Sequence, residues 1–168
     1  MGRKSRRRTN RTRKRRKRTR TVKVTFRGKT RNIPRRYIPK SLTSRQRKKQ
    51  IRSILLKKDR PMLKIKTRKS KWTIVFDKKY GSKIDKMKGG RSKKNIAKVS
   101  GIPYNAIHEV YRKAEGAFYS SGSRPNQSSA SWALGRVYAY IMGGEAVRRL
   151  DNHITEKYNV KFKVPTKK

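Results

Sequence analysis

The sequence predicts a small α+β domain, mainly helical with a few short strands, preceded by a disordered arginine-rich arm. Three observations lead to this prediction. Apolar residues recur at helical spacing in several segments between residues 44 and 158, and shorter segments alternate apolar and polar residues as strands do. Residues 2–20 contain no large apolar side chain. The hydrophobic fraction, 32%, lies well below the about 45–50% of globular proteins, so a core cannot involve the whole chain.

The charge of the chain points to a strongly anionic partner. The 168 residues include 53 Lys and Arg against 8 Asp and Glu, a formal net charge of +45. Such an excess repels itself unless a polyanion or dense counterions lie beside it. We therefore expect the partner to be nucleic acid, with DNA favoured, or acidic protein surfaces, or both. No apolar run approaches the about 20 residues that span a bilayer, so no membrane span is expected.

The positive charge is concentrated at the N-terminus. Residues 1–58 hold 27 Lys and Arg and no acid, and 13 of these cations lie within the first 20 residues. Such a segment cannot offset its conformational entropy by burial, so residues 1–21 are predicted to form a disordered arm. Arginine predominates, and its planar fork suits phosphate oxygens, although a nuclear localisation signal or solubilising tail is an alternative. The predicted polyanion-binding residues of the arm are Arg3, Lys4, Arg6, Arg7, Arg8, Arg11, Arg13, Lys14, Arg15, Arg16, Lys17, Arg18 and Arg20.

Residues 22–91 are predicted to form a basic connecting region of extended, helical and strand segments. Residues 22–26 alternate apolar and polar side chains as a short strand does, and Arg27-Gly28-Lys29 is typical of a turn. The two prolines within residues 33–39 favour an extended course there.

A helix is predicted next, capped by Thr43 or Ser44 and running to about Lys58. Its apolar residues share one face, and four cations share another because they are spaced i, i+3, i+4 and i+7. We predict that this basic stripe lies on a phosphate backbone; a merely solvated face is the alternative. The four residues of the basic stripe are Arg45, Lys48, Lys49 and Arg52.

Two strands and a loop are predicted after this helix. Residues 62–67 form a possible strand, and residues 72–76 give the strongest strand signal in the chain because they are β-branched and aromatic. Residues 88–92, with two glycines, are predicted to form a hinge or loop.

Residues 92–168 are predicted to form a helical body, which begins with a pair of helices over residues 92–115. Ser92 is a suitable cap, Gly101 ends the first helix, and Pro103 suits the first turn of the second. The spacing resembles a DNA-binding helix-turn-helix, with Asn105, Ala106 and His108 placed to reach bases. We interpret the pair as structural, because this surface offers few donors to base edges. The apolar residues at its core positions are Ile96, Ile102, Ile107 and Val110.

A polar, serine-rich loop is predicted over residues 116–127. It leads into a helix capped by Ser128 or Ser129, and the N–H groups and dipole at a helix start favour an anion. The loop is therefore a candidate site for a phosphate or carboxylate, with a hydrogen-bonded turn or a partner-contact loop as alternatives. Its candidate residues are Tyr119, Ser120, Ser121, Ser123, Arg124 and Asn126.

Two helices and a strand complete the predicted body. The helix after the loop runs to about Met142 and ends at Gly143-Gly144. A further helix covers residues 145–158, and a short strand covers residues 160–164.

The chain offers little for catalysis. His108 and His153 are its only histidines, its carboxylates are scattered, and no glycine-rich phosphate loop is present. The absence of cysteine excludes disulfides and thiolate metal sites. We expect no catalytic residue, metal or cofactor, and predict that the chain is not an enzyme; a Ser or Tyr nucleophile beside Arg124 is the remaining alternative.

Three motifs stand out in the sequence: Ile38-Pro39-Lys40-Ser41-Leu42, Lys79-Tyr80-Gly81, and residues 116–127 with the following Ser131-Trp132-Ala133. Together they resemble a family of small basic proteins from large DNA viruses of algae and amoebae, the chlorovirus and mimivirus relatives. The resemblance covers roughly residues 34–155. It implies a viral origin and a virion role; the family has no settled activity, so it implies no functional residues.

We therefore predict that the chain is a non-enzymatic virion structural protein, a minor capsid or capsid-associated component. Its body would contact other capsid proteins while its arm binds the genome or acidic neighbours, in the capsid or core, after assembly in the host nucleus or cytoplasm. One alternative is a free DNA-binding protein, condensing or regulatory, that uses the helix pair. A ribosomal-type RNA-binding protein is another, because the phosphate contribution to binding is common to DNA and RNA.

Overall fold

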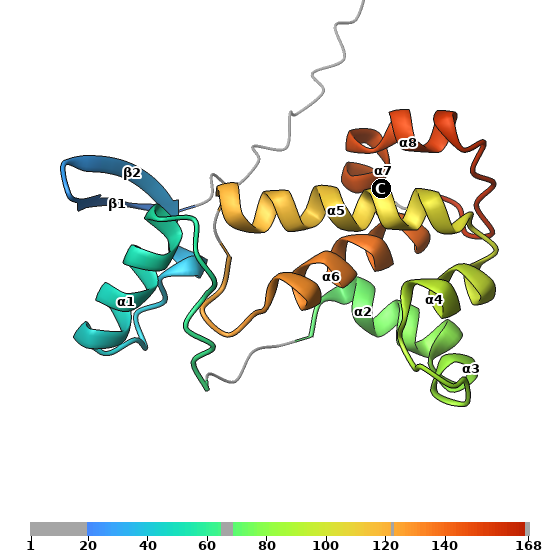
Figure 1. Cartoon of the computed structure of the whole chain (residues 1–168), viewed down its shortest axis with the longest axis horizontal. Helices are drawn as coiled ribbons and strands as arrows, with labels where there is room; N and C mark the ends of the chain where they lie inside the picture. The colour runs from blue at the N-terminus through green and yellow to red at the C-terminus, as the bar shows by residue number, and fades with distance from the viewer. Residues whose placement is uncertain (1–19, 65–68, 122, 167–168) are drawn as a thin grey trace, which may run out of the picture.

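The computed structural model describes residues 20–64, 69–121 and 123–166, and it confirms a mainly helical α+β domain (Figure 1). The predicted arm lies outside the described residues, except for its last residues. In chain order the elements are strands β1 (Thr21–Phe26) and β2 (Lys29–Pro34), a 3-10 helix (Arg35–Tyr37), α1 (Ser44–Leu55), α2 (Lys71–Phe76), a π-helical turn (Asp77–Gly81), α3 (Ser82–Asp85), α4 (Lys93–Ser100), α5 (Tyr104–Ser121), α6 (Ser129–Ile141), α7 (Glu145–Leu150) and α8 (Asn152–Lys157).

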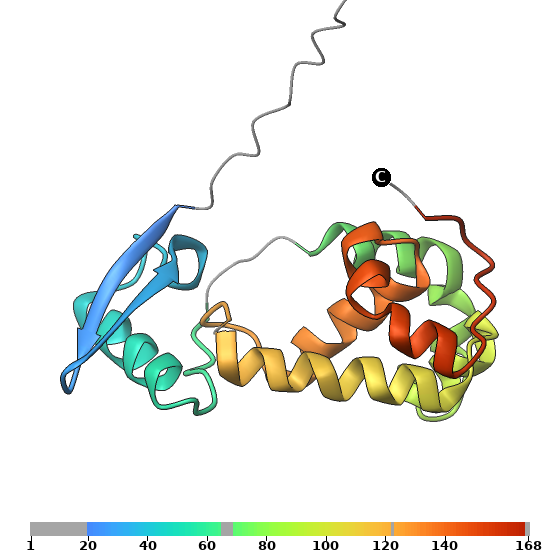
Figure 2. The same cartoon turned by 90° about the horizontal axis from the view of Figure 1, so that it is seen from above.

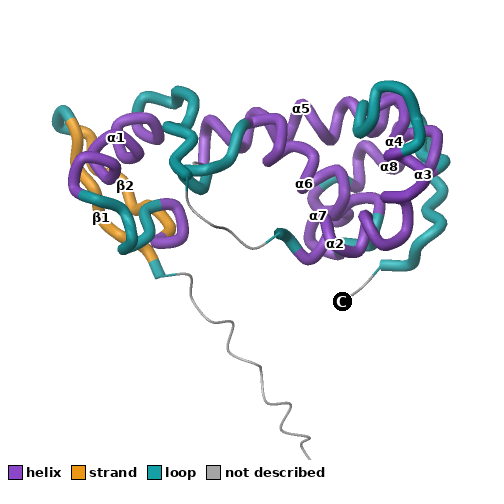
Figure 3. Tube along the Cα trace, turned by 90° about the horizontal axis from the view of Figure 1, so that it is seen from below, coloured by secondary structure: helices purple, strands orange, loops and turns teal. Residues whose placement is uncertain are grey.

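The described residues form two lobes, each with a core of its own. The hairpin lobe, residues 20–64, packs β1 and β2 against α1, and Trp132 contributes to its core from α6. The helical lobe, residues 69–166, contains α2 to α8 and the larger core. The long helix α5 runs from the helical lobe to the hairpin lobe, and the strands are confined to one end of the molecule (Figures 2 and 3).

The β1–β2 hairpin matches the prediction for residues 22–29. The strands pair antiparallel, with Val22 opposite Ile33, and the turn residues Arg27 and Gly28 both have positive φ (48° and 73°). A two-residue turn with both φ values positive matches the right-handed twist of the strands, which explains the glycine. The predicted extended course over residues 33–39 is wrong in part, because a 3-10 helix follows Pro34.

Helix α1 begins at the predicted cap. The Thr43 side chain accepts a hydrogen bond from the Gln46 N–H (3.3 Å), and the Gln46 side chain accepts one from the Thr43 N–H (3.0 Å). This reciprocal arrangement satisfies two N–H groups that the helix leaves unpaired. Gln50 and Ile54 are buried, so the opposite side of α1 faces solvent.

The strand predicted over residues 72–76 is wrong: these residues lie in helix α2. The Ser70 hydroxyl caps it by accepting from the Thr73 N–H (3.1 Å), and Phe76 stacks on Tyr138 of α6 with ring centroids 4.1 Å apart. Phe76, Tyr80 and Ile84 recur every four residues and are all buried. Tertiary packing at helical spacing has therefore overridden the local strand preference.

Two other predicted strands are absent from the described residues. Residues 62–64 follow an irregular course, and residues 65–67 of that prediction lie outside the described residues. Residues 160–164 are also irregular. They contact a side chain in place of a neighbouring strand: the buried Arg148 guanidinium donates to the Val164 carbonyl oxygen (2.8 Å) and lies 3.6 Å from the centre of the Phe162 ring.

The helix pair has the predicted cap, turn and core. Ser92 caps α4, Gly101 ends it in the left-handed conformation (φ 74°), and all four predicted core positions are buried. The loop prediction is wrong for residues 116–121, which continue α5. The cost of about 1 kcal/mol for Gly116 in a helix is outweighed by the burial of Ala114 and Phe118 on either side of it.

The end of the chain differs from prediction in one more place. The helix expected over residues 145–158 is divided into α7 and α8 at Asp151. One core draws on residues 22–63 together with Trp132 and the other on residues 72–164, and the boundary expected at residue 91 stays a prediction. Within the described residues, no helix combines the length and apolarity needed to cross a membrane.

Candidate nucleic-acid interface

The basic stripe occupies the solvent face of α1. Arg45, Lys48, Lys49 and Arg52 are all exposed, opposite the buried Gln50. No ion pair described in the structure involves any of the four. The stripe therefore presents four cations whose charge no neighbouring carboxylate neutralises.

The rotation of α1 about its axis is fixed by a buried amide. The Gln50 side-chain N–H₂ group donates to the carbonyl oxygens of Tyr37 (3.1 Å) and Ser123 (2.9 Å), and no part of Gln50 is exposed to solvent. Buried polar groups pair with specific partners, so this contact selects one orientation of the helix. That orientation turns the basic stripe outward.

A buried arginine fixes the segment after α1. The Arg60 guanidinium donates to the carbonyl oxygens of Ser53 (3.1 Å), Lys58 and Phe118 (2.7 Å), and it lies over the Phe118 ring. Burial lowers the pKa of Arg60 below its usual value. Carbonyl groups near the ends of α1 and α5 hold the cation in place, so this contact needs no carboxylate.

The electrostatic surroundings of the basic stripe are almost free of negative charge. Residues 20–64 contain 17 Lys and Arg and a single acid, Asp59, which accepts a hydrogen bond from the Tyr119 hydroxyl (2.8 Å). The ion pairs found among the described residues all lie in the helical lobe. The hairpin lobe is therefore the more strongly basic of the two.

The arm joins the hairpin lobe directly. Arg20, its last cation, is exposed, and its carbonyl oxygen accepts a hydrogen bond from the Arg35 N–H (2.8 Å) just before β1. The other predicted polyanion-binding residues of the arm, Arg3 to Arg18, lie outside the described residues. In the sequence, the arm therefore leads directly into the lobe that carries the basic stripe.

The serine-rich segment lies at the junction of the two lobes. Tyr119 donates to Asp59, the Ser120 carbonyl oxygen accepts from the Arg31 guanidinium (2.6 Å), and the Pro125 carbonyl oxygen accepts from the Leu63 N–H (2.9 Å). These contacts join α5 and the turn after it to β2 and to the segment after α1.

The remaining candidate residues of this segment differ in their burial and contacts. Ser123 is buried, and its carbonyl oxygen receives the Gln50 amide; Arg124 and Asn126 are half-buried. Ser121 is the last residue of α5. The described contacts of this segment are internal, so they give it a structural role.

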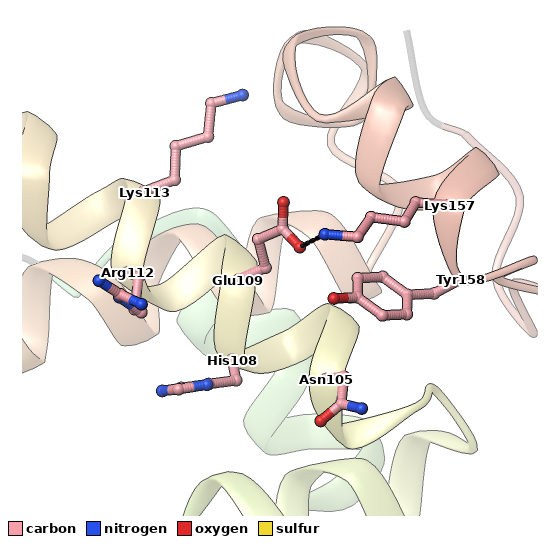
Figure 4. Close-up of a pocket in the computed structure, with 7 residues that line it drawn as sticks. All are labelled: Asn105, His108, Glu109, Arg112, Lys113, Lys157 and Tyr158. Carbon is pink, nitrogen blue, oxygen red and sulfur yellow. Dashed lines mark hydrogen bonds and ion pairs between the residues drawn. The ribbon is translucent and has the colours of Figure 1, made fainter.

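The outward face of α5, the second helix of the pair, lines an open pocket of about 570 Å³ together with Lys157 of α8 and Tyr158 after it (Figure 4). Asn105 and His108 reach this surface, but Ala106 is fully buried and cannot contact a base. The Lys157 ammonium donates to the Glu109 carboxylate (2.9 Å), and this hydrogen bond lowers the pKa of Glu109. The pocket therefore contains an internal ion pair, which the basic stripe does not, although Arg112 of its lining is absent from the described ion pairs.

Among the described residues, no group of three or more His, Asp or Glu side chains is placed to hold a metal ion.

The fold and this surface define a small α+β protein with an exposed, uncompensated basic helix. The chain belongs to a family of unknown function, DUF5824, whose model matches residues 22–157. The match covers both lobes from β1 to α8 and leaves out the arm. Neither the curated proteins nor the solved structures include a match to this chain.

Proposed function

We propose that this chain is a non-enzymatic nucleic-acid-binding protein whose basic stripe lies along a phosphate backbone, with DNA as the favoured ligand. The observation that carries the proposal is the set of four exposed cations on one face of α1 that no carboxylate neutralises. The arginine-rich arm, attached to the same lobe, would extend the contact along the nucleic acid.

The spacing of the basic stripe suits a phosphate backbone. Seven residues of helix separate Arg45 from Arg52, which corresponds to about 10 Å along the axis. Duplex DNA carries one charge per about 1.7 Å of its axis, so roughly six phosphates lie within that length. Contacts to phosphate position a protein without reading sequence, so we expect binding that tolerates any sequence.

The experiment measures the affinity for a DNA duplex as a function of salt, with a variant in which four cations of the stripe become glutamine. Each lost phosphate contact lowers the slope of log affinity against log salt by about 0.9, so the slope should fall by roughly 3 to 4. All four side chains are exposed, so the melting temperature should not change. The substitutions are Arg45→Gln, Lys48→Gln, Lys49→Gln and Arg52→Gln.

A matched control removes the same charge from elsewhere on the surface. Its four exposed cations lie in the helical lobe and are absent from the described ion pairs. If the stripe variant and this control lose the same affinity, only net charge matters and the interface assigned to α1 is wrong. The control substitutions are Arg112→Gln, Arg149→Gln, Lys161→Gln and Lys163→Gln.

For the biological setting, we propose a virion structural role, as a minor capsid or capsid-associated protein that contacts the genome. The proposal rests on the resemblance to proteins of large DNA viruses. The charge distribution is compatible with it: residues 104–158 hold 7 Lys and Arg against 5 acids, a nearly neutral surface available to other capsid proteins. Mass spectrometry of purified virions, separated into shell and core, tests this role, and absence from both fractions would exclude it.

A further inference from the structure

The helical lobe carries a second basic surface, on the helix formed by α2, the π-helical turn and α3. Lys79, Lys83 and Lys86 are spaced i, i+4 and i+7, with Lys78 beside them, and all four are exposed. We refer to these four residues as the lysine surface. Phe76, Tyr80 and Ile84 of the same helix are buried in the core, whereas the lysine surface is exposed to solvent.

The carboxylates nearest in sequence do not neutralise the lysine surface. Asp77 and Asp85 both pair with Arg91, whose guanidinium lies 2.5 Å from an Asp77 oxygen and 3.8 Å from an Asp85 oxygen. The hydrogen bond to Asp77 raises the pKa of Arg91 further above its usual value, so this arginine stays charged. Residues 69–94 hold 10 Lys and Arg against these two acids, and none of the described ion pairs involves the lysine surface.

The two basic surfaces lie in different lobes, which α5 connects. The 18 residues of α5 correspond to about 27 Å along its axis. In Figure 1, α2 and α3 lie on the side of α5 away from α7 and α8, and α1 lies beyond the end of α5 nearest the strands. At about 3.4 Å per base pair, the length of α5 equals roughly 8 base pairs of duplex.

We propose that the lysine surface is a second phosphate-binding surface, and that one DNA duplex lies across both lobes and contacts it together with the basic stripe. This inference rests on the proposed function and specifies its footprint. A duplex of about 8 base pairs, no longer than α5 itself, is too short to lie across both lobes, whereas one of about 24 base pairs, roughly 80 Å, is long enough. Affinity should therefore depend on duplex length through the lysine surface.

The test compares the full-length chain with a variant carrying Lys78→Gln, Lys79→Gln, Lys83→Gln and Lys86→Gln, on both duplexes. On the longer duplex, the variant should lose about 3 from the salt slope and roughly a hundredfold or more in affinity at about 0.1 M salt. On the shorter duplex, the loss should be within about twofold, because the basic stripe still binds. The matched control described above should lose the same small amount on both duplexes.

Failure of this inference is distinguishable from failure of the proposed function. If the unmodified chain binds neither duplex at low salt, the proposed function itself is wrong. Equal losses on both duplexes, or no loss on the longer one, would overturn the two-surface footprint while nucleic-acid binding stands. Energy transfer between separately labelled duplexes that the lysine variant abolishes would also overturn it, because each surface would then hold a different duplex.

Discussion

Asp151 is the residue whose removal should destabilise the helical lobe most clearly. It lies between α7 and α8, and no part of it is exposed. The Arg136 guanidinium donates to both of its carboxylate oxygens (2.8 and 2.7 Å), and the Lys113 ammonium donates to one of them (2.8 Å). In Asp151→Asn, two cations that converge on one buried position would lose their counter-charge.

The expected loss follows from the burial of these groups. Removing one partner of a buried ion pair costs about 3–5 kcal/mol, because the other partner stays desolvated. The side chains of Arg136 and Lys113 retain 18% and 39% of their exposure, so water partly solvates them in the variant. We therefore expect the lower end, about 3 kcal/mol in the free energy of unfolding. For a chain of this size that corresponds to a fall of roughly 6–12 °C in melting temperature.

Urea denaturation followed by circular dichroism measures this free energy, provided the m-value is unchanged. Asp85→Asn is the matched control, because the Asp85 side chain is 64% exposed and its only described ion pair, to Arg91, spans 3.8 Å. An exposed pair of this kind contributes about 1 kcal/mol or less. A loss below about 1 kcal/mol in Asp151→Asn would refute the argument that the buried carboxylate holds these elements together.

The same residue predicts a pH dependence with a definite sign. Burial alone would raise the pKa of Asp151, but the hydrogen bonds from Arg136 and Lys113 outweigh it, so the pKa lies below its usual value of 3.8. A carboxylate with a lowered pKa contributes stability above its unfolded pKa and loses that contribution as pH falls through the folded value. The stability difference between the chain and Asp151→Asn should therefore be constant near neutral pH and shrink in acid below 3.8.

Two further predictions concern the hairpin lobe and the arm. Gln50→Ala removes two buried hydrogen bonds, to the carbonyl oxygens of Tyr37 and Ser123, and should cost about 2–4 kcal/mol in urea denaturation; a loss under about 0.5 kcal/mol would show that α1 is oriented by other contacts. Deleting residues 1–19 removes 12 Lys and Arg but none of the described core, so melting should be unchanged while DNA affinity and its salt slope both fall; unchanged affinity would assign the arm to another partner.

The elements that sequence alone predicted are those whose signals are local. The cap at Thr43, the turn at Gly28 and the end of α4 at Gly101 each depend on one residue and its immediate neighbours. The prediction for α2 was wrong because the segment from Trp72 to Phe76 suits a strand locally. The stacking of Phe76 on a residue far away in the sequence decides in favour of the helix. The local signal that was missed is the capping hydroxyl of Ser70.

In the candidate site too, features with a local sequence signal were predicted and features that depend on distant residues were not. The exposure of the basic stripe follows from helical spacing, which a sequence shows directly. The junction role of the serine-rich segment depends on Arg31, Gln50 and Leu63, which lie far from it in the chain. Those partners donate mainly to main-chain carbonyl oxygens, and a carbonyl is present in every residue, so side-chain identity gave no signal for this contact.

The placement of the few carboxylates explains why so many cations remain available for a ligand. Asp151 and Asp77 each form ion pairs with cations of the helical lobe, so their negative charges are paired within that lobe. The buried Arg60 and Arg148 use no carboxylate, because carbonyl oxygens such as those of Phe118 and Val164 accept their hydrogen bonds. A phosphate backbone that approaches the basic stripe or the lysine surface would therefore form ion pairs without first breaking any among the described residues. Binding would then release condensed counterions from the nucleic acid without breaking ion pairs of the protein, and this release gives the steep salt dependence expected of both surfaces.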